Sequence, residues 1–181
     1  AHEYFDNRGW KVYNKPVPIL DQNSLEYFSR SADQTRRLGL RLGALLKPGQ
    51  VICLSGKLGS GKTTLVQGIA QGWGSTDPVT SPTFVLINEY HRPDDDILFH
   101  LDAYRISSAA EGEDLDLEGM LSRGSLVIEW PENIKGVLPS SVLSIHMNWM
   151  AEEHRSLVMS ITDDEYRGIL DEIRKQVYGG Y

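Results

Sequence analysis

The chain has 181 residues, of which 40% are hydrophobic and 24% charged, and it carries a formal net charge of −7 with a single cysteine. This length fits one domain with a substantial core, and one cysteine excludes both an internal disulfide framework and a cysteine-rich metal site. The acidic charge disfavours direct, tight nucleic-acid binding by this chain alone.

No apolar run in the sequence approaches the roughly 18–20 residues that a membrane span requires, so we expect no membrane association. The start of the chain, AHEYFDNRGW, lacks the basic-then-apolar order of a secretion signal. The cytoplasm is therefore the expected compartment.

Residues 1–23 are polar and weakly patterned, and we interpret them as an N-terminal extension. The regular part of the chain opens with a strand candidate, LEYFS, at 25–29. Ser31 followed by Gln34 forms a capping box, which predicts a helix that runs to about Leu46.

The next stretch contains a phosphate-binding pattern, because GKLGSGKT at 56–63 satisfies G-x-x-x-x-G-K-[ST]. It lies between a predicted buried strand at 50–55 and a helical pattern that ends at Gly72 and Gly74, which is the context that the motif needs. Glycines tolerate positive φ, so consecutive backbone N–H groups can turn inward around a phosphate. We therefore predict a nucleotide site with the following residues: Gly56, Gly59, Ser60, Gly61, Lys62, Thr63 and Thr64. In it, Lys62 would reach the β- and γ-phosphates and Thr63 would reach Mg²⁺.

After the P-loop helix the chain alternates between loop and strand patterns. The loop TSPT at 80–83 offers hydroxyl groups, and a threonine in such a loop can sense a γ-phosphate. FVLINEYH and ILFHLDAYRI flank the turn RPDDD, which predicts a β-hairpin. Glu89 and His100 lie on its two arms, where the pattern fits either surface residues or a polar pair, and neither is assigned a role. An acidic, helix-prone stretch follows at 109–122.

Two carboxylates stand in strand-like runs. Glu129 ends the predicted strand SLVIEW, and Asp102 lies in ILFHLDAYR. A carboxylate in such a place commonly faces water or an arginine, but nucleotide turnover needs an acidic group near Mg²⁺. Beside a P-loop we therefore predict Glu129 and Asp102 at the metal or at the attacking water. Arg155 and Arg105 are the candidates for a positive group at the phosphates.

The end of the chain predicts a second hairpin and a last helix. VLSIHMNWM and RSLVMSIT flank the turn AEEH, and Thr162 with Glu165 forms a capping box for a helix to about Val177. The whole order of elements predicts an α/β protein with the three-layer P-loop NTPase fold, a mixed, largely parallel central sheet and flanking helices. We expect a division into an extension at 1–23, an ATPase domain at 24–162 and a C-terminal helix at 163–181.

In this order, GKLGSGKTT, VTSPTFVLINEY, HLDAYR, VIEWPE and the late Arg155 resemble the TsaE family. These are small P-loop ATPases of the bacterial machinery that makes N6-threonylcarbamoyladenosine at tRNA position 37. The resemblance runs from about Leu25 to Ile161. It implies ATP as the nucleotide, slow hydrolysis alone that partner proteins stimulate, a complex with the TsaB and TsaD proteins, and only indirect contact with tRNA.

The resemblance also implies roles for single residues. Lys62 and Thr63 match the family's phosphate and Mg²⁺ residues, and Glu129 matches its metal-associated glutamate. Asp102 matches an acidic residue needed for turnover. Two further residues complete the set, Thr83 in a switch-like loop and Trp130 beside the nucleotide.

Three other functions are alternatives to this interpretation. A P-loop small-molecule kinase should carry an acceptor-binding region and an arginine-rich lid, and no arginine cluster follows the P-loop in the sequence. A regulatory GTPase needs the pattern N-K-x-D, whereas the sole Asn-Lys pair, Asn14-Lys15, precedes the P-loop. A nucleotide-sensing scaffold would differ from an ATPase mainly in its turnover rate.

Overall fold

The computed structural model describes residues 4–5, 11–12, 21–80 and 86–178. Its main sheet has the strand order β3-β9-β8-β4-β7-β6-β5, and β1 and β2 pair separately. The strands are β1 (Tyr4–Phe5), β2 (Lys11–Val12), β3 (Ser24–Ser29), β4 (Val51–Ser55), β5 (Ile87–His91), β6 (Ile97–Asp102), β7 (Gly124–Glu129), β8 (Leu143–Ala151) and β9 (His154–Ile161). The α-helices are α1 (Ala32–Leu45), α2 (Lys62–Trp73), α3 (Ala109–Glu113), α4 (Leu117–Leu121) and α5 (Arg167–Tyr178), and the 3-10 helices are η1 (Pro131–Ile134) and η2 (Asp164–Tyr166).

The middle of the sheet is parallel and its two sides are antiparallel. β8, β4, β7 and β6 run in the same direction, whereas β5 pairs antiparallel with β6, and β9 pairs antiparallel with both β8 and β3. Both predicted hairpins and the predicted mixed sheet are confirmed. Because the central strands are parallel, the loops after β4, β6 and β7 all leave from the same edge.

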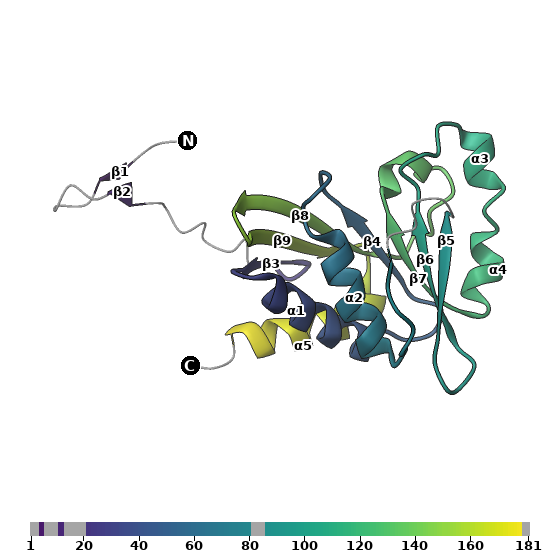
Figure 1. Cartoon of the computed structure of the whole chain (residues 1–181), viewed down its shortest axis with the longest axis horizontal. Helices are drawn as coiled ribbons and strands as arrows, with labels where there is room; N and C mark the ends of the chain where they lie inside the picture. Colours follow the sequence, from purple (N-terminus) through teal and green to yellow (C-terminus); the bar gives the residue numbers. More distant parts are fainter. Residues whose placement is uncertain (1–3, 6–10, 13–20, 81–85, 179–181) are drawn as a thin grey trace.

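Helices cover both faces of the sheet, which confirms the predicted three layers. Figure 1 shows α1, α2 and α5 on one side and α3 and α4 beyond β5, β6 and β7. Alternate residues of β4 divide between the two cores. Ile52 and Leu54 pack in the core with α1, α2 and α5, while Val51 and Cys53 pack in the core with α4 and η1. No helix among the described residues has the length and apolar character of a membrane-spanning segment.

Two details of the helices differ from or refine the sequence predictions. The acidic stretch 109–122 forms α3 and α4 rather than one helix, because Asp116 has φ +48 and its side chain caps α4 by accepting from Gly119 N. The capping box predicted at Thr162 is wrong. The Thr162 hydroxyl accepts from Val142 N at 3.0 Å, and Asp163 instead caps η2 by accepting from Glu165 N at 3.0 Å.

The first helix starts as predicted. The Ser31 hydroxyl accepts from Gln34 N at 3.1 Å, while the Gln34 side chain accepts from Arg30 N at 2.8 Å. These two bonds place the beginning of α1 directly after β3, at the edge of the sheet from which the P-loop leaves.

Helices α1 and α2 touch through their main chains. A Cβ added at Gly43 would lie 2.0 Å from the carbonyl oxygen of Ile69, and one added at Gly68 would lie 2.1 Å from that of Arg36. Only glycine fits such distances. The backbones of α1 and α2, the helix that follows the P-loop, are therefore in direct contact.

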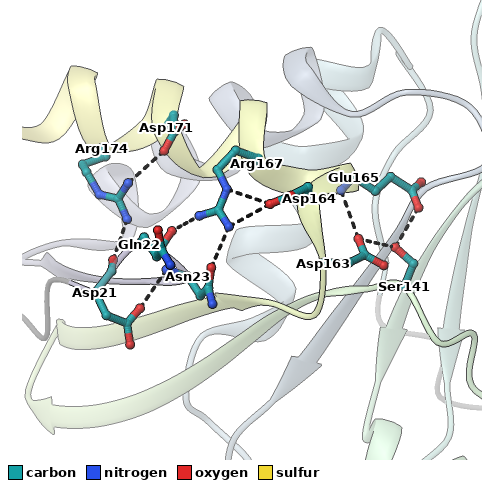
Figure 2. Close-up of polar contacts among 10 residues, drawn as sticks. All are labelled: Asp21, Gln22, Asn23, Ser141, Asp163, Asp164, Glu165, Arg167, Asp171 and Arg174. Atoms are coloured by element: carbon teal, nitrogen blue, oxygen red, sulfur yellow. Dashed lines mark hydrogen bonds and ion pairs between the residues drawn. The ribbon is translucent and has the colours of Figure 1, made fainter.

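Helix α5 holds the segment that leads into β3, in an arrangement that we call the α5 clamp: Arg167 and Arg174 bound to residues 21–24. Figure 2 shows both arginines reaching from α5 to this segment. Arg174 donates to the carbonyl oxygens of Asp21 at 2.9 Å and Ser24 at 3.2 Å. Arg167 donates to the carbonyl oxygen of Gln22 and to the Asn23 side chain.

Candidate nucleotide site

The P-loop is the turn between β4 and α2, and its glycines adopt conformations that other residues avoid. Gly56, Gly59 and Gly61 have φ of +142°, +77° and +101°. A Cβ on Gly56 would also lie 2.5 Å from the carbonyl oxygen of Met147. The loop therefore delivers its backbone to the amino end of α2, where N–H groups and the helix dipole attract anions.

Lys62 lies against its own loop. Its side-chain amine donates to the carbonyl oxygens of Gly56 at 2.6 Å and Lys57 at 3.1 Å, and the residue is only 6% exposed. Burial lowers the pKa of Lys62, while the charges of Glu129 and Asp102 act in the opposite direction. The ammonium group is thus held in the P-loop and interacts electrostatically with both predicted carboxylates.

The two carboxylates lie side by side at the edge where the P-loop emerges. Asp102 and Glu129 are register partners at the ends of the parallel strands β6 and β7. Glu129 is 4% exposed, and the half-buried Asp102 accepts from Tyr104 N at 2.9 Å. Burial raises the pKa of Asp102 and the Glu129 charge adds to this, whereas the Tyr104 N–H and the Lys62 charge lower it. The structure therefore brings Lys62, Asp102 and Glu129 together.

Trp130 lies directly beside the P-loop lysine. It follows β7 with φ +57°, and its ring centroid is 4.8 Å from the Lys62 amine and 4.9 Å from the Tyr104 ring. A cation over an aromatic face is stabilised by the ring quadrupole. Trp130 therefore lies at the P-loop lysine, and its place beside a nucleotide stays a prediction.

Arg155 reaches the P-loop from the β8–β9 hairpin, but through carbonyl groups. It donates to the carbonyl oxygens of Ser60 at 2.9 Å, Glu152 at 2.7 Å and His154 at 3.0 Å. Its guanidinium group therefore supports the outer side of the loop in this structure. Arg105, the other predicted cation, is exposed.

A groove of about 130 Å³ opens beside the loop, between α1 and the β8–β9 hairpin. Its walls come from Ala32, Thr35, Gly61, Thr64, Glu153 and Arg155. Thr63 and Thr64 occupy the first turn of α2 and are half-buried. Thr83, predicted in a switch-like loop, lies outside the described residues.

The residues present fit a magnesium ion that is bound together with a nucleotide. In the part of the chain that the structure describes, no group of three or more His, Cys, Asp or Glu could hold a metal ion by itself. Mg²⁺ takes oxygen ligands and keeps several waters, so it needs only one or two carboxylates plus phosphate oxygens. Asp102, Glu129 and the Thr63 hydroxyl supply oxygen donors of this kind. The Ser60 hydroxyl, buried in the loop without a hydrogen-bond partner among the described residues, is another polar atom there.

Sequence reasoning missed two residues of this site. His100, fully buried on β6, has its Nε2 2.8 Å from Glu129 Oε1, and its Nδ1 is 3.1 Å from the hydroxyl of Tyr90 on β5. Glu89 points elsewhere, 3.6 Å from His91 Nε2. The available signal was a histidine within the apolar run ILFHLD, whose partner could be identified only from the pairing of β6 with β7.

Comparisons with known proteins give one consistent result. The family model described as "Threonylcarbamoyl adenosine biosynthesis protein TsaE" matches residues 29–157. The TsaE protein of Treponema pallidum is 38% identical over 133 residues, which cover 73% of this chain and 97% of that protein. The TsaE protein of Bacillus subtilis is 32% identical over 154 residues, which cover 83% of this chain and 94% of that protein. The crystal structure of Bacillus subtilis YdiB matches with a TM-score of 0.72 and 28% identity, covering 84% of this chain and 95% of that one.

Proposed function

Because the chain belongs to the TsaE family of threonylcarbamoyl adenosine biosynthesis proteins, we propose that it binds ATP with Mg²⁺ at the P-loop and hydrolyses it in support of that tRNA modification. The observation that carries the proposal is the convergence of Lys62, Asp102 and Glu129 at one edge of the sheet. A loop that only held a phosphate would not need two adjacent carboxylates, whereas phosphoryl transfer to water uses acidic groups at the metal and at the nucleophile.

Each part of the site then has a distinct task. The loop N–H groups and Lys62 bind the phosphates, and the groove lined by Thr35 and Thr64 receives the nucleoside. Thr63, Asp102 and Glu129 would hold Mg²⁺, which when bound neutralises charge that develops on the phosphate oxygens. Glu129 also orients the attacking water, because a nearly buried carboxylate is held in one direction by its neighbours.

We also propose that the protein acts with TsaB and TsaD in the cytoplasm and reaches tRNA only through that complex. The net charge of −7 speaks against independent tRNA binding. Large apolar side chains lie exposed around the P-loop edge, among them Leu58 at 72% and Trp149 at 62% exposure. Exposed apolar groups gathered around a site are typical of a surface that another protein covers.

The test is phosphate release from Mg-ATP, measured with the protein alone and with TsaB and TsaD added. We expect slow release alone, a marked increase with partners, and no effect of excess GTP. Lys62→Ala should lose nucleotide binding and serves as the blank. Lys57→Ala is the matched control, because Lys57 lies in the same loop but is exposed.

Two outcomes would redirect the proposal. A rate that partners leave unchanged would contradict the complex. Transfer of the γ-phosphate to a small molecule rather than to water would favour the kinase alternative, which the family match does not support.

A further inference from the structure

A chain of buried polar side chains runs behind Glu129 through the core of the sheet. His100 is fully buried and Tyr90 is 2% exposed. The Tyr90 hydroxyl lies 3.1 Å from His100 Nδ1, and His100 Nε2 lies 2.8 Å from Glu129 Oε1. Their neighbours on the same strands include the fully buried Leu98 and Val127. Burying an imidazole and a carboxylate is unfavourable unless the two groups are paired, as they are here. Their presence in an otherwise apolar core therefore calls for an explanation.

Strand register explains how the three side chains meet. Residues 98, 100 and 102 of β6 point to one face of the sheet, the face covered by α1 and α2. His100 pairs across the sheet with Asn88 and Val127, so Tyr90 and Glu129 are each two residues away on the neighbouring strands. Diagonal neighbours at this distance lie within reach of long side chains.

The direction of the hydrogen bonds follows from chemistry. A carboxylate oxygen is a hydrogen-bond acceptor, so we assign His100 Nε2 as the donor and Glu129 Oε1 as the acceptor. With Nε2 assigned as the donor to Glu129, Nδ1 is left to accept, and the Tyr90 hydroxyl lies 3.1 Å from it, within donating distance. A hydrogen bond donated by Tyr90 to Nδ1 would favour the tautomer of His100 that presents an N–H to Glu129.

At the far end of this network, the Tyr90 hydroxyl has two possible hydrogen-bond acceptors. The Tyr90 hydroxyl lies 3.4 Å from the carbonyl oxygen of Thr80, but His100 Nδ1 is nearer at 3.1 Å. The Asn88 side chain also donates to the Thr80 carbonyl oxygen, at 3.0 Å, so this oxygen keeps a donor when the Tyr90 hydroxyl is directed at His100. The Tyr90 hydroxyl is therefore available to donate a hydrogen bond to His100 Nδ1.

We propose that His100, with Tyr90 behind it, is a positioning residue that holds Glu129 in its working orientation. The proposal rests on the proposed ATP hydrolysis, in which Glu129 acts at the metal and the water. The hydrogen bond engages Oε1 and prevents rotation of the carboxylate, so Oε2 is the oxygen presented to the site. Groups that orient a ligand in this way commonly change activity by about 10- to 100-fold when removed.

The experiment separates positioning from general stability. His100→Leu removes the donor, Tyr90→Phe removes a single hydroxyl, and His100→Gln restores an N–H donor of similar reach. ATP turnover with partners, the KM for ATP, the Kd for ADP and the melting temperature are measured for each. His91→Gln is the matched control, because His91 is an exposed histidine on β5.

We expect kcat to fall about 10- to 100-fold in His100→Leu and about 2- to 10-fold in Tyr90→Phe, with KM and Kd nearly unchanged. His100→Gln should recover part of the loss. If His100→Leu fails to fold, Tyr90→Phe carries the test, since it changes one atom. In the double variant Tyr90→Phe/Glu129→Gln, the tyrosine change should have no further effect on turnover, because its effect passes through Glu129.

Several results would overturn the inference. Equal turnover in wild type and Tyr90→Phe, or fully additive effects in the double variant, would show that the chain does not act through Glu129. A fall in melting temperature with parallel loss of ADP binding would indicate a structural role alone. If the wild-type protein with its partners releases no phosphate from ATP, the proposed function fails first, and the inference with it.

Discussion

Two polar networks lie near opposite edges of the central sheet and differ in both their residue types and their surroundings. On the β5–β7 side, Tyr90, His100 and Glu129 form a buried chain of single contacts. On the β3 side, the α5 clamp makes many contacts at the surface, with Arg167 also donating to Asp164 and Arg174 to Asp171 (Figure 2).

The difference lies in what each network would lose when one member is removed. Water replaces a missing partner at the surface, so exposed ion pairs contribute about 0–1 kcal/mol each. In the core, a missing partner leaves an unsatisfied donor or acceptor, at about 1–3 kcal/mol, more for a charged group. The α5 clamp is therefore redundant, which suits it to holding residues 21–24 in place. The buried network of Tyr90, His100 and Glu129 is not redundant, which suits it to holding one carboxylate.

The largest effect is expected at the end of the buried chain. Glu129→Ala should reduce ATP turnover at least about 100-fold, as removal of one group that stabilises the transition state does, while nucleotide binding is partly retained. Phosphate release and ADP titration measure the two quantities. Glu89→Ala, at an exposed carboxylate of β5, is the control. Undiminished turnover in Glu129→Ala would show that the buried network has no role in ATP hydrolysis.

The next effect concerns the helix that carries the clamp. Leu170 of α5 is 1% exposed within the core shared with α1 and β3, so Leu170→Ala should lower the free energy of unfolding by about 2–5 kcal/mol. Denaturant unfolding measures it, with an alanine at the exposed Lys175 of the same helix as control. A loss under about 0.5 kcal/mol, the range of ordinary surface substitutions, would show that α5 contributes to the fold only through its surface bonds.

A smaller loss is expected where α1 and α2 meet. Gly68→Ala places a methyl group 2.1 Å from the carbonyl oxygen of Arg36, and the helices must separate to admit it. We expect a destabilisation of about 1–3 kcal/mol. Gly136→Ala, where nothing lies within 4 Å of the added carbon, should be nearly neutral in the same melting experiment.

The smallest effect should come from the clamp itself. Arg174→Ala removes two bonds to the carbonyl oxygens of Asp21 and Ser24, and we expect a loss of about 1 kcal/mol or less. Turnover should remain at the wild-type level. A loss of more than about 2 kcal/mol would show that the two networks do not differ in redundancy, and would break the comparison.

The sequence predicted those parts of the molecule that depend on local pattern. The P-loop, the two hairpins and the start of α1 follow from glycine spacing, alternation and a capping box, and each is where expected. The Thr162 cap failed because the pairing of Thr162 with Val142, 20 residues away, took the hydroxyl that a cap would need. The pairing of His100 with Glu129 was not predictable, because it depends on the register between two strands joined by a long connection.

The α1–α2 contact also limits how the protein could be adapted to an unnatural nucleotide. The groove beside the P-loop has α1 residues Ala32 and Thr35 on one side and α2 residue Thr64 on the other. Since main-chain atoms meet at Gly43 and Gly68, no change of rotamer alters the spacing of the two helices. On the proposed placement of the nucleoside in this groove, a design that pairs an enlarged base with a trimmed protein would gain little more than the volume of the Thr35 side chain, because the backbone contact fixes the spacing of the two helices.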